Sequence, residues 1–413
     1  MTLPLSGANP DNRPWLETRT HRDYLLADAQ RQFDFFRASI RPEGGFYSLD
    51  SSGNPLPDTV QELHSTTRMV HSYALGKLAG FGDCDEMIDQ GIRYLKTNHH
   101  DREHGGYFWG VDGAKATDSR KLAYGHVFVL LAAASAHSAG HLDAQALLDD
   151  VDAVLNEHFW EEEHGLFCDE WNQDWTPFST YRGMNANMHG TEALLTAFEV
   201  TGREIYLERA GRILDFFVGK IAPANSWRLV EHYNADWTPD RAYSENPMFR
   251  PAGTTPGHSL ELARLLLQYW DLSGRPNTDA PTAARRLAET ALADAWDQES
   301  GGLYYTLNFD GTPLIKPRYW WPVTEAIGVV ATLLKLEGTA QDEEWYRKLW
   351  TFADAHFVDH IHGGWFPEID DQGKPTETQF RGKPDIYHAL QAVLFPLTSG
   401  ISNMGEGVKG LRG

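Results

Sequence analysis

The chain is poor in cysteine, in basic residues and in long apolar runs. Only Cys84 and Cys168 occur among 413 residues, too few for a disulfide framework or a zinc ribbon, and this scarcity favours a reducing compartment. Lys and Arg number 36 against 58 Asp and Glu, a net charge of −22. An acidic surface argues against nucleic acid and anionic membranes as partners. No apolar stretch approaches the ~18 residues that a transmembrane helix needs.

Several sequence signatures are also missing. The start, MTLPLSGANPDNRPW, lacks the basic residues and apolar run of a signal peptide, so we expect a cytoplasmic protein. A G-x-S-x-G elbow, a glycine-rich phosphate loop, a dinucleotide fingerprint between a predicted strand and a predicted helix, an H-E-x-x-H pair and calcium-loop spacing are all absent. We therefore expect no cofactor and no metal, although histidines from separate parts of the chain could still form a metal site.

What the chain does contain is a repeat. A glycine pair followed by aromatic residues recurs 61 residues apart from Gly45 to Gly106, and 62 apart from Gly302 to Gly364. A third opening at Gly165 follows Gly106 by 59 residues. Each opening is followed by a turn of Gly, Asn or Asp, which predicts a β-hairpin, and then by helical periodicity. Predicted helices cover 21–40, 65–78, 85–96, 125–136, 144–158, 187–200, 204–217 and 323–336, with others beginning after His258 and near Asp385.

Six such units without a linker predict one closed array, an all-α (α/α)6 barrel with six inner and six outer helices and short hairpins at the active-site end. The barrel is expected over about residues 15–398 of a single catalytic domain, with 399–413 as a loose tail. Two stacked helical domains are the alternative. The 14 Trp and 16 Tyr divide between core packing and surfaces on which a sugar ring could stack.

Polar residues stand where nearly every hairpin leads into the next helix. In a barrel these junctions meet at one mouth, although each residue alone is better explained as a buried histidine or a solvated charge. By unit they are Glu62, His64 and Arg68; Tyr124 and His126; Arg182, Asn185, His189 and Glu192; Arg250, His258 and Glu261; Arg318, Trp320, Trp321 and Glu325; Arg381, Lys383, Asp385 and His388.

The stretch Pro247–Arg264 is the most informative of these junctions. Gly253, Pro256 and Gly257 punctuate a loop, Thr254 or Thr255 could cap the helix that follows, and His258 and Glu261 share one face of that helix. A histidine at such a position can act as a proton-transferring base. A capped helix with a histidine buried in the core fits the same pattern.

Four motifs together resemble the N-acylglucosamine 2-epimerase superfamily, and within it the aldose–ketose isomerase branch that includes D-mannose and sulfoquinovose isomerases. The resemblance covers nearly the whole chain. The motifs are Arg182-Gly183-x-Asn185-Ala186-Asn187-Met188-His189, Gly253-x-x-Pro256-Gly257-His258-x-x-Glu261, Trp321-Pro322-x-x-Glu325-Ala326 and Asp385-Ile386-Tyr387-His388.

The resemblance implies cofactor-free proton transfer between C2 and C1 of a free monosaccharide. It implies that His258 and His388 are the catalytic acid–base pair. It also implies sugar-binding roles for Arg68, His189, Asn185, Arg250, Glu261, Trp321 and Glu325, to which the junction pattern adds Tyr124 and His126. Glu261 and Glu325 would orient the histidines or polarise a hydroxyl.

The expected reaction is D-mannose to D-fructose, and D-lyxose to D-xylulose is a second expected substrate pair. A sulfoquinovose isomerase is the first alternative, which would require a cation such as Arg381 or Lys383 for the sulfonate. A sugar 2-epimerase acting on N-acylglucosamine, glucose or mannose is the next. A glycoside hydrolase or lyase would need two opposed carboxylates, for which Glu261 and Glu325 are candidates. A non-catalytic sugar-binding protein remains a further alternative. The partner in each case is a small sugar, and the sequence leaves monomer and homo-oligomer both open.

Overall fold

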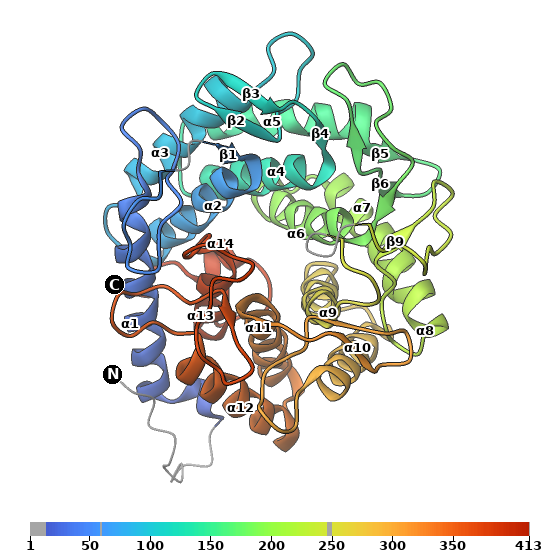
Figure 1. Ribbon diagram of the computed structural model, residues 1–413. Coiled ribbons are helices and arrows are strands. Elements are labelled where there is room, and N and C mark those ends of the chain that lie inside the picture. The colour runs from blue at the N-terminus through green and yellow to red at the C-terminus, as the bar shows by residue number, and fades with distance from the viewer. Residues whose placement is uncertain (1–13, 58–59, 246–249, 413) are drawn as a thin grey trace. The chain divides into compact units, whose positions relative to one another are not determined.

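The computed structural model describes residues 14–57, 60–245 and 250–412, and these residues are mostly helical (Figure 1). They divide into two compact units. The first unit comprises Met1–Ala38, Ser48–Pro55 and Gly253–Gly413, and the second comprises Ser39–Tyr47 and Leu56–Ala252. Residues 247–249, the first of the stretch predicted as a loop before His258, lie outside the described residues, as do 1–13. The prediction of a single catalytic domain stays a prediction.

The second unit contains three consecutive helix pairs. Figure 1 shows their first helices, α2, α4 and α6, side by side, with α4 in contact with both others. Each second helix ends in a π-helical turn. The bounds are α2 Leu63–Ala79, α3 Asp85–Tyr94 with η3 Leu95–His99, α4 Ala123–Ser138, α5 Ala144–Val154 with η4 Leu155–Phe159, α6 Met184–Thr201, α7 Glu204–Leu214 with η5 Asp215–Ile221, and the short α8 Ala222–Ala224.

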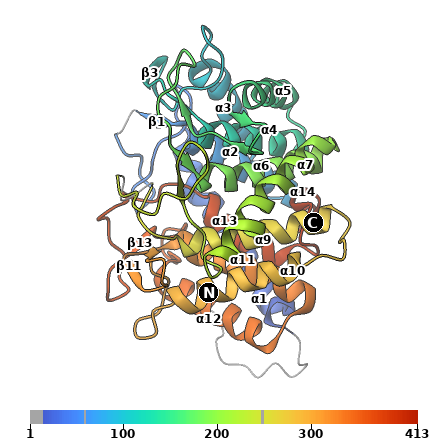
Figure 2. The ribbon, with the colours of Figure 1, turned by 90° about the vertical axis from the view of Figure 1, so that its right-hand side faces the viewer.

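The first unit contains the other three pairs, and its last pair joins the two ends of the chain. Helix α13 packs against α1, so the first long helix of the sequence is the partner of the last. Figures 1 and 2 show α9, α11 and α13 side by side. The bounds are η1 Trp15–Glu17, α1 Arg19–Phe36, η2 Arg37–Ser39, α9 Pro256–Leu272, α10 Ala280–Ala295, α11 Trp320–Glu337, α12 Ala340–His356, α13 Tyr387–Leu397 and α14 Met404–Gly407.

The two helices of a pair differ in composition, and this difference explains their packing. Helix α4 buries every residue from Gly125 to Ala136, as its uninterrupted apolar sequence predicts. Its partner α5 buries a single stripe that includes Leu147, Leu148 and Val151, the pattern of an amphipathic helix. Burial of the first helix of each pair therefore builds the core of each unit.

Short antiparallel strands connect neighbouring repeats at the ends of these helices. A two-residue strand precedes the first helix of a pair and bonds to the hairpin of the following repeat, as in β12 with β13 and β4 with β7. The strands are β1 Gln61–Glu62, β2 Gly110–Asp112, β3 Lys115–Asp118, β4 Lys121–Leu122, β5 Trp160–Glu161, β6 Leu166–Phe167, β7 Glu170–Trp171, β8 Arg182–Gly183, β9 His232–Tyr233, β10 Thr306–Leu307, β11 Pro313–Ile315, β12 Arg318–Tyr319 and β13 Glu368–Ile369.

An ion pair recurs with the repeat. An acidic residue just before the glycine opening bonds a basic residue at the end of the same hairpin, as Asp359 Oδ2 and Lys383 Nζ do at 2.7 Å. Lys121 Nζ likewise lies 2.9 Å from Asp101 Oδ2. The other two pairs are Glu161 with Arg182 and Asp297 with Arg318. Each pair ties the opening of a hairpin to the segment that leads into the following helix.

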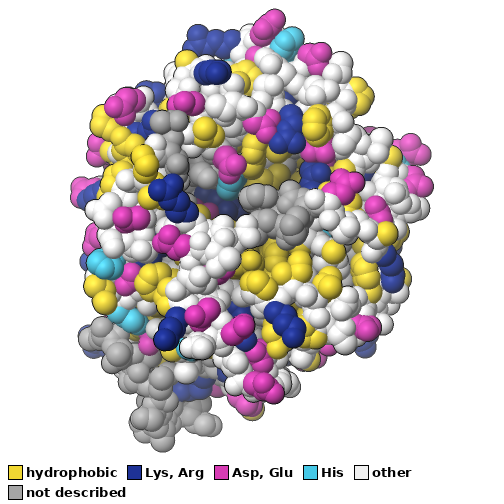
Figure 3. All heavy atoms as spheres, viewed as in Figure 1, with side chains coloured by type: hydrophobic (Ala, Val, Ile, Leu, Met, Phe, Trp, Pro, Cys, Tyr) yellow, Lys and Arg dark blue, Asp and Glu magenta, His cyan; other side chains and the backbone are white. Residues whose placement is uncertain are grey.

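The segment expected to be a loose tail is partly packed. It contains the short helix α14 and fully buries Val408. Figure 3 shows acidic side chains scattered among basic and apolar ones over the face of Figure 1, without a single continuous patch. None of the helices in the described part of the chain is long and apolar enough to cross a membrane.

Candidate active site

His388 and Glu325 form a buried pair in the first unit. His388 lies in the first turn of α13 and Glu325 in the second turn of α11, and Nδ1 of the imidazole is 2.9 Å from Oε1 of the carboxylate. His388 is 5% exposed and Glu325 is 1% exposed. Because a carboxylate can only accept, Nδ1 carries the hydrogen and Nε2 keeps its lone pair. The pair thus has the form of an oriented general base.

His258 contacts the same indole. The Trp321 ring centroid is 5.1 Å from that of His258 and 5.9 Å from that of His388, and both imidazoles are tilted against it. Gly257 makes this contact possible, since a Cβ there would approach the Trp321 ring to 2.3 Å. Three helices, α9, α11 and α13, therefore bring the two predicted catalytic histidines around one aromatic side chain.

The loop before α9 sets the place of His258. Thr255 occupies the N-cap position and Pro256 begins the helix, but the Thr255 side chain makes no capping hydrogen bond, contrary to the expected cap. The backbone N–H of His258 instead donates to the Thr255 carbonyl at 3.0 Å. Glu261, one turn later, is buried. The stretch singled out in the sequence thus contributes a histidine and a buried carboxylate from the same helix.

A second group of predicted residues gathers in the second unit. Arg68 on α2 donates from Nη2 to the Tyr124 hydroxyl at 2.9 Å, and its guanidinium lies 4.7 Å from the centre of the Phe128 ring. His189 on α6 meets Tyr124 edge to face at 5.3 Å, and its Nδ1 is 3.8 Å from Glu192 Oε2. The structure brings Arg68, Tyr124 and His189 together, as the sequence predicts.

His64 joins this group through its neighbours. Its ring stacks on Trp109 at 5.1 Å and an interplanar angle of 10°. Burial holds the pKa of His64 well below its usual value, and the charges of Arg68 and His189 add to the effect. His64 is therefore a neutral imidazole, and Trp109 supplies the aromatic face on which it stacks.

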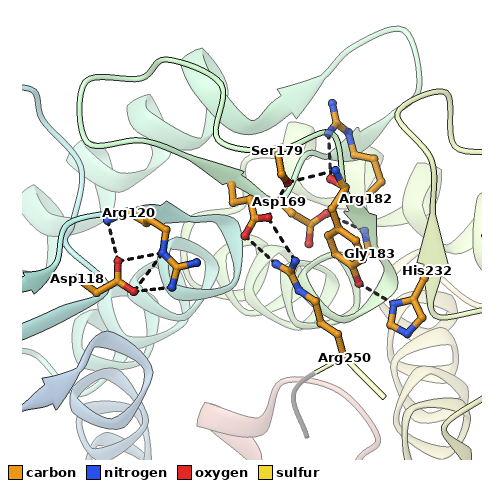
Figure 4. Close-up of polar contacts among 10 residues, drawn as sticks. Asp118, Arg120, Asp169, Ser179, Arg182, Gly183, His232 and Arg250 are labelled. Carbon is orange, nitrogen blue, oxygen red and sulfur yellow. Dashed lines mark hydrogen bonds and ion pairs between the residues drawn. The ribbon is translucent and has the colours of Figure 1, made fainter. Parts of the chain in front are cut away.

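Arg250 belongs to a separate cluster at the hairpin ends of the second unit (Figure 4). Its Nη2 is 2.8 Å from Glu170 Oε2 and its guanidinium lies 3.9 Å from the centre of the Tyr181 ring. The Tyr181 hydroxyl donates to Nδ1 of His232 at 2.8 Å, since Nε2–H donates to the Pro251 carbonyl at 2.7 Å. Arg250 is thus fixed by an ion pair and a ring rather than standing alone.

Asp169, next to this cluster, has a raised pKa because it is buried. Its Oδ2 accepts the Gly183 N–H at 2.7 Å, and burial raises the pKa of Asp169 to about 7 against the opposing effect of Arg250.

In the same region the two asparagines of the Arg182 motif differ. Asn187 bonds the Phe167 backbone on both sides, whereas Asn185 Oδ1 is buried without a hydrogen-bond partner among the described residues. Asn185 is therefore the one suited to bind a ligand.

The prediction that His126 binds substrate needs correction. His126 is fully buried, its Nδ1–H donates to the Leu122 carbonyl at 2.7 Å, and its Nε2 accepts the Tyr107 N–H at 3.0 Å. Both ring nitrogens are occupied by backbone groups. His126 therefore belongs to the scaffold, where it fixes the hairpin opening against α4.

His126 makes stability depend on pH. Burial lowers the pKa of His126 to about 3 from 6.5, so the folded chain resists a proton that the unfolded chain accepts. The stability that comes from keeping this ring neutral is fully present above pH 6.5, and it is lost as the pH falls toward 3 and the unfolded chain takes up the proton. One such group should cost about 2 kcal/mol at pH 5. We expect urea unfolding at pH 7 and pH 5 to show a smaller difference for His126→Gln than for the parent; an equal difference would contradict this assignment.

The basic residues at the hairpin ends are also less available than expected. Lys383 is 1% exposed, and its Nζ bonds Asp359 Oδ2 and, at 2.6 Å, the Gly363 carbonyl. Arg182 and Arg318 are held by their acidic partners in the same way. Part of the polar pattern at the helix starts is therefore structural, and Lys383 is not a free cation for a sulfonate.

The chain belongs to the N-acylglucosamine 2-epimerase (GlcNAc 2-epimerase) family, whose model matches residues 44–392. It is 42% identical over 393 residues to the D-mannose isomerase of Thermobifida fusca, covering 93% of this chain and 96% of the relative. It is 38% identical to the D-mannose isomerase of Pseudomonas cannabina pv. alisalensis, covering 96% of this chain and 97% of that one.

Solved structures agree with these relatives. A crystal structure of D-mannose isomerase matches with a TM-score of 0.87 and 33% identity over 94% of this chain and 99% of that chain. The cellobiose 2-epimerase of Spirochaeta thermophila matches with a TM-score of 0.82 and 25% identity, covering 93% and 97%. These findings confirm the predicted family, the (α/α)6-barrel fold class and the assignment of the chain as an isomerase.

Proposed function

We propose that the chain is a cofactor-independent aldose–ketose isomerase that converts free D-mannose to D-fructose, with D-lyxose and D-xylulose as a second substrate pair. The observation that carries this proposal is the carboxylate-oriented imidazole of His388, which shares the Trp321 ring with His258. The two D-mannose isomerases that align along nearly their whole length support the choice of sugar.

In the proposed mechanism one histidine assists opening of the pyranose ring by proton transfer, and we assign this step to His258. Nε2 of His388 then removes the proton at C2 of the open aldose, and the electron pair forms a cis-enediolate. The proton of the C2 hydroxyl passes to the adjacent oxygen on C1, and the imidazolium of His388 returns the carbon-bound proton to C1, so that C2 becomes the ketone and C1 carries the hydroxyl. Each correctly placed acid or base contributes ~10²–10⁴-fold.

Glu325 has a defined part in this proposal. As His388 takes the proton its ring becomes positive, and the carboxylate 2.9 Å away stabilises that charge while holding the ring orientation. Trp321 offers an apolar face on which the C–H side of a sugar can pack. The other residues that we propose to bind the sugar are Arg68, His189, Tyr124, Asn185, Arg250 and Glu261.

The observations weaken the sulfoquinovose isomerase alternative more than the 2-epimerase alternative. A sulfoquinovose isomerase needs a cation for the sulfonate, and the pairing of Lys383 with Asp359 removes one of the two candidates named from the sequence. A 2-epimerase is the stronger competitor, because a 2-epimerase structure matches with a TM-score of 0.82. It would return the proton to the opposite face of C2, and we would assign that step to His258, whose ring contacts the same indole as His388.

Product analysis separates these activities. Purified chain should be incubated with mannose, lyxose, glucose, N-acylglucosamine and sulfoquinovose in deuterated water, and the sugars resolved by chromatography and NMR. We expect fructose from mannose and xylulose from lyxose. Glucose as the main product of mannose would instead establish an epimerase, and turnover of sulfoquinovose without mannose would establish the sulfonate enzyme. Binding without exchange at C2 would indicate a non-catalytic protein.

A further inference from the structure

A buried line of charged groups continues inward from His388. Glu325 contacts His388 through Oε1, and its other oxygen, Oε2, lies 3.8 Å from Nη2 of Arg264 on α9. All three residues are at most 5% exposed. The guanidinium is thus linked to the proposed base through Glu325.

The packing around Arg264 fixes its side chain. Its guanidinium lies 4.2 Å from the centre of the Phe395 ring on α13. A Cβ at Gly328 on α11 would approach Arg264 Cδ to 3.3 Å, so this glycine leaves room for the arginine stem. Nε and Nη2 of Arg264 have no hydrogen-bond partner within the described chain, and Glu325 is its ion-pair partner. The contact therefore acts through charge rather than through a hydrogen bond.

We infer that Arg264 is a positioning residue for the proposed reaction, holding Glu325 ionised so that Glu325 orients His388 as a base. The inference rests on the proposed function. A buried carboxylate is costly to ionise, and a guanidinium 3.8 Å away offsets that cost. A neutral Glu325 could donate to Nδ1 of His388 and place the imidazole hydrogen on Nε2, which removes the basic lone pair.

The same geometry predicts a pH effect with a definite sign. Removing the positive charge of Arg264 makes it easier for the Glu325–His388 pair to keep an extra proton. Because the base must be unprotonated, the acidic limb of the kcat profile moves to higher pH. The other ionisable side chains on these helices or at their starts are unchanged in the variant. They are His258, Glu261, Tyr269 and Asp271 on α9, Lys335 and Glu337 on α11, and Asp385 and Tyr387 at the start of α13.

The test uses Arg264→Met, which keeps stem length and loses charge, and Arg264→Lys, which keeps charge. Arg286→Met, an exposed arginine on α10, is the matched control. For Arg264→Met we expect the acidic limb to rise by about one pH unit, which lowers kcat about tenfold on that limb, with KM within about twofold. In Arg264→Lys the acidic limb should return most of the way to its position in the parent, and the kcat profile of the control should match that of the parent.

A second measurement shows whether Arg264 acts through Glu325. In a Glu325→Gln background, adding Arg264→Met should leave the limb where it is, because the carboxylate it supports is gone. NMR of ¹³Cε1-labelled histidine, with His388 assigned by its loss in His388→Gln, should give a higher titration midpoint in Arg264→Met even without turnover.

An unchanged limb and midpoint in folded Arg264→Met, or an equal shift in both backgrounds, would overturn the inference. If Arg264→Met does not fold, as judged by circular dichroism, Arg264→Gln, which also loses the charge, replaces it under the same criteria. Failure of the proposed function is a separate result: the parent would make no fructose, and the profiles would then be measured by C2 hydrogen exchange on the sugar that it does process.

Discussion

His388→Ala is expected to lower kcat for mannose by ~10²–10⁴-fold. Nδ1 of His388 is held by the Glu325 carboxylate at 2.9 Å, so the basic lone pair of the imidazole is on Nε2 and has a fixed orientation. Removing the ring removes the acceptor of the C2 proton, while KM should change much less because the ring is not proposed to hold the sugar. Steady-state kinetics by detection of fructose gives both numbers.

His362→Ala is the matched control for this variant. His362 is an exposed histidine of the same unit, so its loss should leave kcat unchanged. Thermal unfolding of both variants shows whether the fold survives. Activity within about tenfold of the parent in folded His388→Ala would remove His388 from the role of principal base.

Lys383→Met is expected to lower the free energy of unfolding by ~3–5 kcal/mol, because it leaves Asp359 buried without its cation. Asp359 Oδ2 and Lys383 Nζ are 2.7 Å apart, and both side chains are almost fully buried. The ammonium also bonds the Gly363 carbonyl. Urea unfolding at pH 7 measures the loss directly.

Two further variants interpret that result. Lys383→Met with Asp359→Asn removes both charges and should recover part of the lost stability. Lys409→Met removes an exposed lysine paired with Glu406 and should have no measurable effect. A stable Lys383→Met variant with weakened sugar binding would contradict the structural role and restore Lys383 as a ligand group.

The sequence predicted most of the helix pairs because their periodicity is strong. The predicted span 65–78 corresponds to α2 over Leu63–Ala79, and 204–217 to α7 over Glu204–Leu214 with its π turn. Helices α10 and α12 were not identified from the sequence, although their apolar stripes are ordinary. The packing of α1 on α13 was also missed, because periodicity gives no information on contacts between the two ends of a chain.

Site residues that belong to a sequence motif could be predicted. Residues whose role depends on their hydrogen-bond or ion-pair partners in the fold were harder to predict. His388, Glu325 and Trp321 come together as expected. His126 and Lys383 have the residue types of a sugar site, but backbone and carboxylate partners occupy them. A signal existed for the second case: an acid before the glycine opening and a base at the hairpin end recur together in the sequence. Arg264 follows Glu261 by one helical turn, yet its contact with Glu325 depends on how α9 packs on α11.

The central claim is that His388 carries the C2 proton of mannose to C1. The most direct measurement follows mannose labelled with deuterium at C2 by NMR in ordinary water with purified chain. The account predicts slower turnover than with unlabelled mannose, fructose with part of its label at C1, and loss of both the label transfer and the turnover in His388→Ala. Label retained at C2 while sugar binds, or glucose in place of fructose, would contradict it.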